Sequence, residues 1–259
     1  MRTKRTLFIF AFTAMFVGGA HAQQGSLQAK FDLGYGFPAG MNYVDDNTGT
    51  TRTAVPFSYG AGLNVDLGAT YFVSDHIGFG LDLNYLLGSP VVYHDFTDNG
   101  IRGNIVTNNT LTSYLFAVTP NLVLSLNNPG VNPYARIGLV LGSASVIQTS
   151  TEDGTNANSG TNIETTTGNI ALGFYGGTGV QFTLSDNLAL DVELFGRIMS
   201  FEPTQSVNTQ AYDGLQKSPT ITYAKSIDNT TAANTELTPE LPFTSIGIKV
   251  GIVMKFGSH

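Results

Sequence analysis

The sequence contains no cysteine, so the protein can form no disulfide and has no cysteine to carry the lipid of a lipoprotein. Charged residues are also scarce, at 12% of the 259 residues, whereas a soluble protein of this size usually carries about twice that fraction. Beyond the N-terminal region there is no run of roughly 18 apolar residues, so no membrane-spanning helix is predicted there. Low charge, together with abundant Gly, Thr and aromatic residues, suits a sheet whose outer face meets lipid.

The N-terminal residues are organised like a secretory signal peptide. A basic segment at 2–5 precedes an apolar segment at 7–19, and residues 20–22 read Ala-His-Ala, the A-x-A pattern of a cleavage site. The apolar segment is shorter than the roughly 20 residues that a spanning helix needs. The sequence therefore predicts a signal peptide over 1–22, with cleavage between Ala22 and Gln23.

Residues 23–259 show period-two alternation of apolar and polar residues in eight segments, most clearly in the last one. From Ile246 to Phe256 every second residue is apolar, and Gly, Lys or Val residues fall between them. Successive strand residues point to opposite faces, so one face of this strand is apolar. The pattern predicts one domain with strands at about 27–37, 57–73, 76–87, 112–126, 134–147, 169–184, 187–201 and 244–256.

The segments between these strands alternate in length. Three are short turns, at 74–75, 127–132 and 185–186, and four are long, at 38–56, 88–111, 148–168 and 202–242. Each strand reaches the roughly 9–11 residues needed to span a bilayer. Short turns on one side and long loops on the other are typical of outer-membrane barrels. We therefore expect an all-β fold, an eight-stranded antiparallel transmembrane β-barrel with short periplasmic turns and four long extracellular loops.

A soluble β-barrel or sandwich is the alternative, with its apolar residues inside and its charges outside. The placement of charge favours the membrane barrel, because every Lys and Arg after residue 22 lies in a long loop or on the polar face of a strand. If the apolar face meets lipid, five basic and five acidic side chains point into a lumen just wide enough for side chains, where they must be paired or hydrated. This predicted lumen charge network is Lys30, Asp32, Asp66, Asp82, Arg136, Asp191, Glu193, Arg197, Lys249 and Lys255.

The long loops are strongly acidic. They hold twelve acids and four bases, a charge of 4 − 12 = −8. Anionic lipopolysaccharide is the expected neighbour of this face, with divalent cations or basic partners as companions. The longest loop, 202–242, is either disordered or a binding surface. Aromatic residues near the strand ends predict two interfacial girdles, Phe37, Tyr59, Tyr85 and Tyr114 at the loop side and Tyr71, Phe182 and Phe256 at the turn side.

These features resemble the small outer-membrane β-barrel family, which includes the opacity-type proteins and the transmembrane domain of outer-membrane protein A. The resemblance covers the chain after the signal peptide and rests on the strands, on the Gly-rich motifs at 32–36 and 78–85, and on the final strand ending at Phe256. It implies that Phe256 is the aromatic signal read by the barrel assembly machinery. In the family this aromatic is usually the last residue, whereas here Gly257-Ser258-His259 follow it.

Sequence signals for catalysis, metals or cofactors are weak. Ser89 with His94-Asp95 supplies the residue types of a catalytic triad, but a loop histidine at the surface is the simpler interpretation. Gly34-x-Gly36-x-x-Ala39 matches a dinucleotide fingerprint in letters only, since no helix follows, and its glycines are better explained as space for lumen side chains. Asp45-Asp46 and Glu152-Asp153 could ligate Ca²⁺ but lack EF-hand spacing. We predict no catalytic residue, no cofactor, no metal and no nucleic-acid partner.

The favoured function is therefore non-enzymatic. We expect a structural or surface-interaction barrel of the bacterial outer membrane, with a lumen closed by salt bridges and an unknown surface ligand held by its loops. The first alternative is a narrow channel for small or apolar molecules, similar to outer-membrane protein W. The second is an outer-membrane lipid-modifying enzyme.

Overall fold

The computed structural model describes residues 25–40, 43–98, 104–154, 161–210, 220–227 and 234–257. The predicted signal peptide and its cleavage site between Ala22 and Gln23 lie outside these residues. Within them, no helix is long and apolar enough to cross a membrane.

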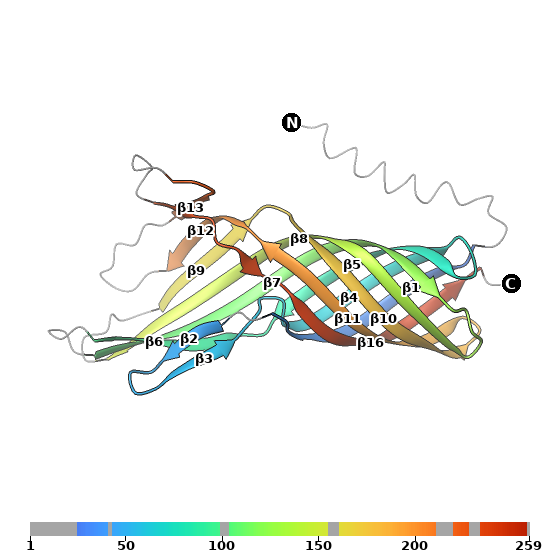
Figure 1. Cartoon of the computed structure of the whole chain (residues 1–259), viewed down its shortest axis with the longest axis horizontal. Helices are drawn as coiled ribbons and strands as arrows, with labels where there is room; N and C mark the ends of the chain where they lie inside the picture. Colours follow the sequence, from blue (N-terminus) through green and yellow to red (C-terminus); the bar gives the residue numbers. More distant parts are fainter. Residues whose placement is uncertain are drawn as a thin grey trace.

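Eight strands close into an antiparallel barrel (Figure 1). Each pairs with the next one along the wall, and the last closes the ring on the first, with Leu27 opposite Phe256. The predicted eight-stranded fold is confirmed, and five of its strands end within about two residues of their predicted bounds. Around the wall the strands are β1 (Leu27–Pro38), β4 (Gly62–Phe72), β5 (Ile77–Gly88), β7 (Asn104–Ser125), β8 (Val131–Gly154), β10 (Ala171–Ser185), β11 (Leu188–Phe201) and β16 (Ser245–Phe256).

Three short turns, at 73–76, 126–130 and 186–187, join strands at one end of the barrel, which we call the turn end. The opposite end, which carries the long connections, is called the loop end. In the longest turn, Asn127 has φ 52° and Gly130 has φ 79°. These left-handed conformations suit the two residue types that adopt them at least cost, so the local sequence explains the tight reversal.

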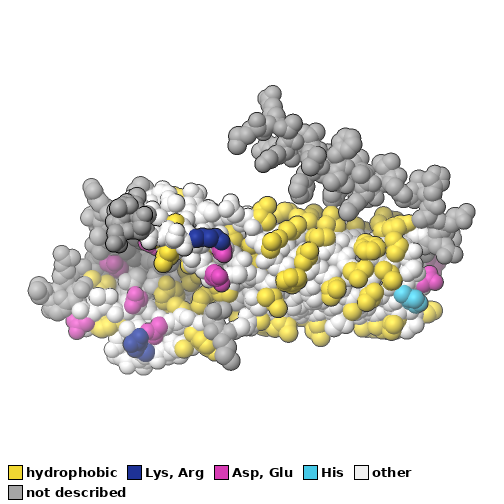
Figure 2. Space-filling model, turned by 45° about the horizontal axis from the view of Figure 1, so that its top comes forward, with side chains coloured by type: hydrophobic (Ala, Val, Ile, Leu, Met, Phe, Trp, Pro, Cys, Tyr) yellow, Lys and Arg dark blue, Asp and Glu magenta, His cyan; other side chains and the backbone are white. Residues whose placement is uncertain are grey.

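The apolar face of each strand points outward. Leu172 and Ile198, for example, are 73% and 67% exposed. Apolar side chains form a broad band across the face of the barrel seen in Figure 2, while the charged side chains visible there lie beyond the two edges of the band. Exposure of such an area to water would cost about 25 cal/mol per Å². Lipid removes this cost, which is why the alternation specifies a membrane barrel rather than a soluble one.

The loop end is more regular than the sequence predicts. The long connections contain β2 (Tyr43–Asn47), β3 (Arg52–Pro56), β6 (Val91–Asp98), β9 (Thr161–Gly168), β12 (Pro203–Gln210), β13 (Thr220–Ala224), β14 (Thr235–Leu237) and β15 (Leu241–Pro242). The sequence predicts these connections only as long loops. They form strands because β7 and β8 continue past the barrel, and the Thr-, Asn- and Val-rich segments beside them pair with their edges. We call the sheet β6-β7-β8-β9-β12-β13-β14, beyond the barrel wall, the extension.

The second predicted strand is shorter than expected. Residues 57–61 leave the wall and turn across the loop end, and β4 begins only at Gly62, where φ is 141°. Hydrogen bonds to the segment that precedes β16 hold this turn inward: Tyr59 N–H donates to the carbonyl of Pro242, and Ser58 Oγ donates to that of Thr244 at 2.6 Å. Tyr59 is therefore part of the interior and not of a lipid-facing girdle, whereas Phe37, Tyr85, Phe182 and Phe256 do face outward.

Candidate functional site: the barrel lumen and its loop end

Glu193 on β11 lies at the centre of a buried charge cluster. Its Oε2 accepts a hydrogen bond from Tyr134 Oη at 2.7 Å and lies 2.9 Å from Arg136 Nε and 3.7 Å from Lys30 Nζ. Its Oε1 accepts a hydrogen bond from the hydroxyl of Tyr175. The Glu193 side chain is fully buried, so these neighbours replace the water that the carboxylate would otherwise bind.

Three further carboxylates complete this layer, two of them from other strands and one, Asp191, from β11 itself. Asp32 Oδ2 on β1 is 2.6 Å from Lys30 Nζ, and Asp82 Oδ2 on β5 is 2.7 Å from Arg136 Nη1. Asp191 accepts the hydroxyl hydrogen of Tyr134 at 2.8 Å. The ion pairs of Glu193 with Lys30 and Arg136, and of Asp82 with Arg136, therefore connect strands that are not neighbours in the wall.

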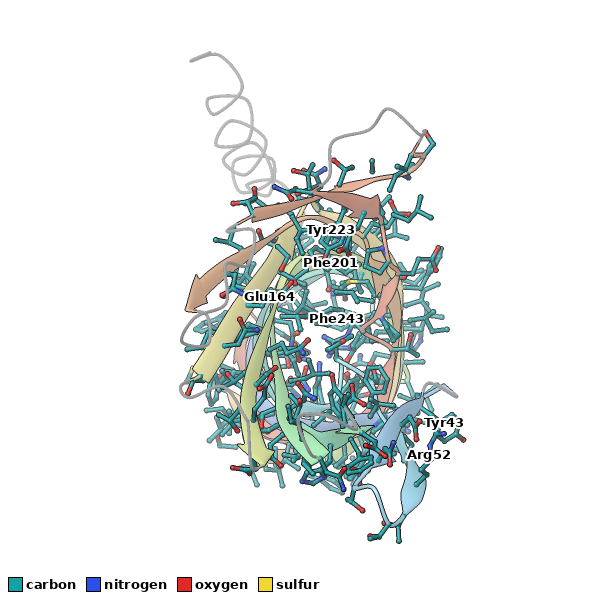
Figure 3. The ribbon with its side chains drawn as sticks, turned by 90° about the vertical axis from the view of Figure 1, so that its left-hand side faces the viewer. Tyr43, Arg52, Glu164, Phe201, Tyr223 and Phe243 are labelled. Atoms are coloured by element: carbon teal, nitrogen blue, oxygen red, sulfur yellow. The ribbon has the colours of Figure 1, made fainter. Side chains whose placement is uncertain are left out.

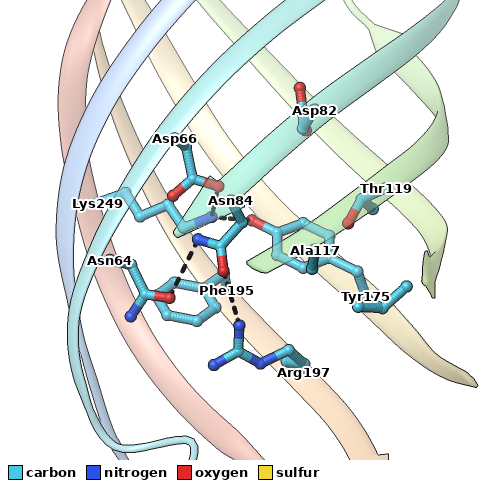
Figure 4. Close-up of a pocket in the computed structure, with 11 residues that line it drawn as sticks. Asn64, Asp66, Asp82, Asn84, Ala117, Thr119, Tyr175, Phe195, Arg197 and Lys249 are labelled. Atoms are coloured by element: carbon cyan, nitrogen blue, oxygen red, sulfur yellow. Dashed lines mark hydrogen bonds and ion pairs between the residues drawn. The ribbon is translucent and has the colours of Figure 1, made fainter. Parts of the chain in front are cut away.

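Lys249 on β16 occupies the next layer toward the loop end (Figure 4). Its ammonium group is 3.0 Å from Asp66 Oδ1 and donates to the Tyr175 hydroxyl at 3.1 Å. It also lies 4.6 Å from the ring centre of Phe195 and 4.8 Å from that of Tyr175. One carboxylate and two aromatic faces thus stabilise a cation that the barrel buries almost completely.

Arg197 differs from the other buried cations because its partners in the described part of the chain are neutral. It donates to Asn84 Oδ1 at 2.9 Å, to the Gly60 carbonyl at 3.2 Å and to the Phe243 carbonyl at 3.4 Å. Gly60 and Phe243 belong to the two segments that turn inward at the loop end. Arg197 therefore ties these segments to the wall.

The structure places nine of the ten predicted network residues inside the lumen, four basic and five acidic. The tenth, Lys255, lies at the turn end of β16. It pairs with Gln28 beside the end of the strand, is half-buried, and forms none of these ion pairs. The alternation along β16 predicts that the Lys255 side chain faces the lumen, but a residue this close to the turn end is also exposed to solvent.

Glycines on the inward face provide the space that the charged side chains occupy. A Cβ at Gly34 would lie 2.5 Å from Cγ of Lys249, and one at Gly251 would lie 2.1 Å from Oδ1 of Asp32. A Cβ at Gly68 would meet Oδ1 of Asp82 at the same 2.1 Å. The Gly34-x-Gly36 spacing is thus explained by lumen packing in a β-strand, and it is no part of a dinucleotide site.

An apolar layer lies above the charges at the loop end. Phe201 and Phe243 are fully buried with ring centres 6.1 Å apart, and Tyr59 packs on Phe243 at 5.7 Å. Figure 3 looks into the barrel from this end and shows Phe201 and Phe243 inside the ring of strands. We call Tyr59, Phe201 and Phe243 the aromatic cork. The cork is not among the residues predicted from the sequence, although the alternation Phe195, Arg197, Met199, Phe201 along β11 indicates that Phe201 points inward.

A small cavity lies within the charged part of the lumen. A cavity of about 10 Å³ lies among Asn64, Asp66, Asn84, Tyr175 and Arg197, with other side chains around it, which is room for about one water molecule (Figure 4). At the turn end, Phe72, Val123 and Tyr134 form a second, smaller apolar cluster. The interior thus consists of an apolar layer, a charged layer and the aromatic cork, in that order.

The candidate catalytic residues of the second long connection are not brought together. His94 Nδ1 is 2.8 Å from Asp46 Oδ1, and its backbone N–H donates to the same oxygen at 2.7 Å. These bonds hold the pKa of Asp46 below its usual value. Ser89 instead shares a hydrogen bond with Tyr35 at 2.7 Å. The predicted partner of His94, Asp95, is replaced by a residue of the β2–β3 hairpin.

The candidate calcium ligands also have other partners. Asp45 forms an ion pair with Arg52, which lowers the pKa of that carboxyl, and Asp153 accepts a hydrogen bond from Asn108 at 2.6 Å. Among the described residues, no three or more Asp, Glu or His side chains are grouped so that they could hold a metal ion.

The closed eight-stranded barrel, its apolar outer band and its polar interior define a membrane-spanning β-barrel protein. The chain belongs to the outer membrane protein beta-barrel domain family, whose profile matches residues 10–213. The turn end and the loop end therefore correspond to the periplasmic and extracellular ends of the barrels in this family.

The chain is similar to several solved outer-membrane proteins at low identity. Neisserial surface protein A is 14% identical, with 90% of this chain and 97% of that chain covered and a TM-score of 0.39. OprG from Pseudomonas aeruginosa is 11% identical, with 91% and 98% covered and a TM-score of 0.45. A major outer membrane protein from Thermus thermophilus is 14% identical, with 89% and 99% covered and a TM-score of 0.46. No curated protein matches the chain.

Proposed function

We propose that this protein is a non-conducting, non-enzymatic barrel of the bacterial outer membrane that holds its extension outside the cell as a surface for a binding partner. The predicted signal peptide supports export to that membrane. The observation that carries the proposal is the combination of a densely filled lumen with two strands that continue, unbroken, from the membrane wall into the extension.

The length of β7 and β8 supports the proposal that the barrel holds the extension outside the membrane. β7 has 22 residues and β8 has 24, whereas spanning the bilayer takes roughly 9–11. About 11 residues of β7 therefore project beyond the membrane, which corresponds to roughly 30 Å at about 3.3 Å per residue and a tilt of about 40°. Hydrogen bonds to β6 and β9 continue along this length, so the surface is held by a sheet rather than by single loops.

The charge of this surface favours a basic partner or one bridged by divalent cations. The loop-end connections carry twelve acids and four bases. Most of the acids lie on the extension or the β2–β3 hairpin, and Figure 2 shows several of them beyond the apolar band. Electrostatic steering would speed the approach of a basic partner and would weaken as salt increases.

The side chains that fill the lumen favour a closed barrel and not an open channel. An ion would have to pass the cluster of Glu193, Arg136 and Lys30 and then the aromatic cork, and the cavity beside Lys249 has room for about one water molecule. The apolar path that a channel for apolar molecules needs is interrupted by the charged layer.

The test is single-channel conductance of the refolded protein in planar bilayers. We expect the wild type to be silent, Lys249→Ala and Asp82→Ala to leak only intermittently, and a Lys249→Ala/Phe243→Ala double variant to leak more, because it opens two layers. Arg52→Ala, on the exposed β2–β3 hairpin, is the matched cation control and should be silent. Steady wild-type conductance whose ion selectivity changes in Lys249→Ala would overturn the proposal in favour of a channel.

A further inference from the structure

A groove of about 370 Å³ lies on the outside of the barrel where the wall meets the extension. Its inner side is formed by residues 169–172 at the start of β10 and by Ser200, Glu202, Pro203 and Thr204, where β11 ends and β12 begins. Its other side is formed by Tyr223 and Lys225 at the end of β13 and by Thr238 and Glu240. Its volume is within the range of small-molecule sites, about 300–1,000 Å³.

The groove opens onto the apolar band, and the wall becomes more polar toward it in three steps. Phe174 and Ile198 face each other across β10 and β11, and both are mostly exposed. Nearer the loop end, Leu172 and Ser200 line the groove, and so do Ile170 and Glu202 beyond them. An occupant must therefore be amphiphilic, with an apolar part on the wall and a polar part under the extension.

A lysine stands at the polar end of this gradient. Lys225 Nζ is 2.9 Å from Glu202 Oε2, and its side chain is 82% exposed. The ion pair raises the pKa of Lys225, so the amine stays charged over the physiological range. In the described part of the chain, the other cations outside the lumen are Arg52 and Lys255, and neither lines the groove. Figure 2 shows a Lys or Arg side chain beside acidic ones at the edge of the apolar band, where a lipid headgroup would lie.

We propose that this groove binds a phosphorylated glycolipid of the outer leaflet, that is, the lipid anchor of lipopolysaccharide. The acyl chains lie on Leu172, Phe174 and Ile198, a phosphate accepts hydrogen bonds from Lys225, and the sugar hydroxyls meet the polar lining. The groove faces the leaflet that borders the loop end, which in an outer membrane is made of this lipid. A lining of hydroxyl, amide and carboxylate groups suits a sugar headgroup better than the small headgroup of a phospholipid.

The charge of the groove adds a requirement. One lysine and two glutamates, Glu202 and Glu240, leave a formal charge of 1 − 2 = −1, which repels a bare phosphate. The lipid therefore binds as its magnesium salt, with Mg²⁺ between a phosphate and a glutamate, while Lys225 contacts the phosphate directly.

The test is titration of the purified full chain with bisphosphorylated lipid A, followed by native mass spectrometry with and without Mg²⁺. We expect Lys225→Ala and Leu172→Ser each to weaken binding about tenfold, since each removes one main contact. Arg52→Ala and Ile137→Ser are the matched controls, an exposed cation and an outward apolar residue away from the groove, and both should bind like the wild type. All four side chains are at the surface or face lipid, so a gel-mobility shift on heating should show each variant folded.

Two comparisons decide between lipid sources. Phosphatidylethanolamine and dephosphorylated lipid A should each bind at least tenfold more weakly than lipid A, and removal of Mg²⁺ should lower lipid A binding. The proposal is overturned if the groove variants bind like the wild type, if the controls weaken equally, or if phosphatidylethanolamine binds as well as lipid A. It is independent of the proposed function, because a silent, partner-binding barrel could lack this site and a conducting one could have it.

Discussion

At the scale of single residues, the most consequential side chain is Glu193. It contacts two cations and two tyrosine hydroxyls from other strands, and all four of these partners are buried. Buried ion pairs of this kind contribute little net stability when intact, because burial offsets their attraction, but they cost much when one partner is lost.

We expect Glu193→Gln to lower the free energy of unfolding by roughly 3–5 kcal/mol, because Arg136 and Lys30 would lose their shared counter-charge. Urea unfolding of the lipid-embedded protein measures this change. Asp153→Asn, on the exposed part of β8, removes a carboxylate that accepts one hydrogen bond and should stay within about 0.5 kcal/mol of the wild type. Equal changes in the free energy of unfolding for the two substitutions would show that the central position of Glu193 adds nothing to its effect on stability.

At the scale of elements, the β2–β3 hairpin protects the free edge of the extension. β6 pairs with β7 on one side only, and its other edge would expose unpaired backbone groups. Asp46 on β2 accepts the His94 N–H of this edge and contacts the His94 ring. Asp45, Arg52 and Asp95 are the other charged groups around this contact.

Docking of this hairpin should weaken in acid. The pKa of Asp46 is below its usual 3.8 in the folded protein, so its contribution is complete above pH 3.8 and is lost as the pH falls through the lowered value. Because the chain has no cysteine, spin labels at Thr50→Cys and Thr97→Cys can report the distance by pulsed electron paramagnetic resonance. The distance distribution should broaden below pH 3.8, whereas an Asp46→Ala background should be broad at every pH. A distribution that stays narrow in that background would show that other contacts hold the hairpin.

The last strand, β16, carries the predicted assembly signal. Phe256 is half exposed at the turn end, opposite Leu27, where the final pair of strands closes the barrel. Met254 lies on the same face two residues earlier and is similarly exposed, so it is a matched control. We expect Phe256→Ala to reduce the amount of folded barrel in the outer membrane of expressing cells several-fold, and Met254→Ala to leave it nearly unchanged. Similar loss in both variants would indicate a role in lipid contact rather than in recognition by the assembly machinery.

At the scale of the whole molecule, the two ends of the barrel differ. Every short turn lies at one end, together with the beginning of β1 and the end of β16, and the extension lies at the other (Figure 1). This arrangement decides which surface a partner outside the cell can reach.

Surface labelling of intact cells tests that direction. A maleimide linked to a long polyethylene glycol, too large to cross the outer membrane, should label Thr50→Cys at the tip of the β2–β3 hairpin. It should label Asp75→Cys in a short turn only after the membrane is permeabilised. Labelling of Asp75→Cys in intact cells, with Thr50→Cys protected, would reverse the orientation and place the extension in the periplasm.

The sequence by itself determined the membrane wall of this protein. Alternation of apolar and polar residues, the lengths of the strands and the alternation of short and long connections depend on one strand at a time, and each strand must satisfy its backbone within the same wall. The inward parity of Lys30, Glu193 and Lys249 follows from the same period of two.

Only the tertiary structure decided what fills the two ends of the barrel and what lies beyond it. Residues 57–61 leave the wall because the carbonyls of Pro242 and Thr244, about 185 positions away, accept their hydrogen bonds. The extension forms because segments of the long connections pair with the edges of β7 and β8. In the same way, His94 contacts Asp46, which is distant in the sequence, and not its neighbour Asp95. Such contacts are set by closure of the ring, and no local pattern encodes them.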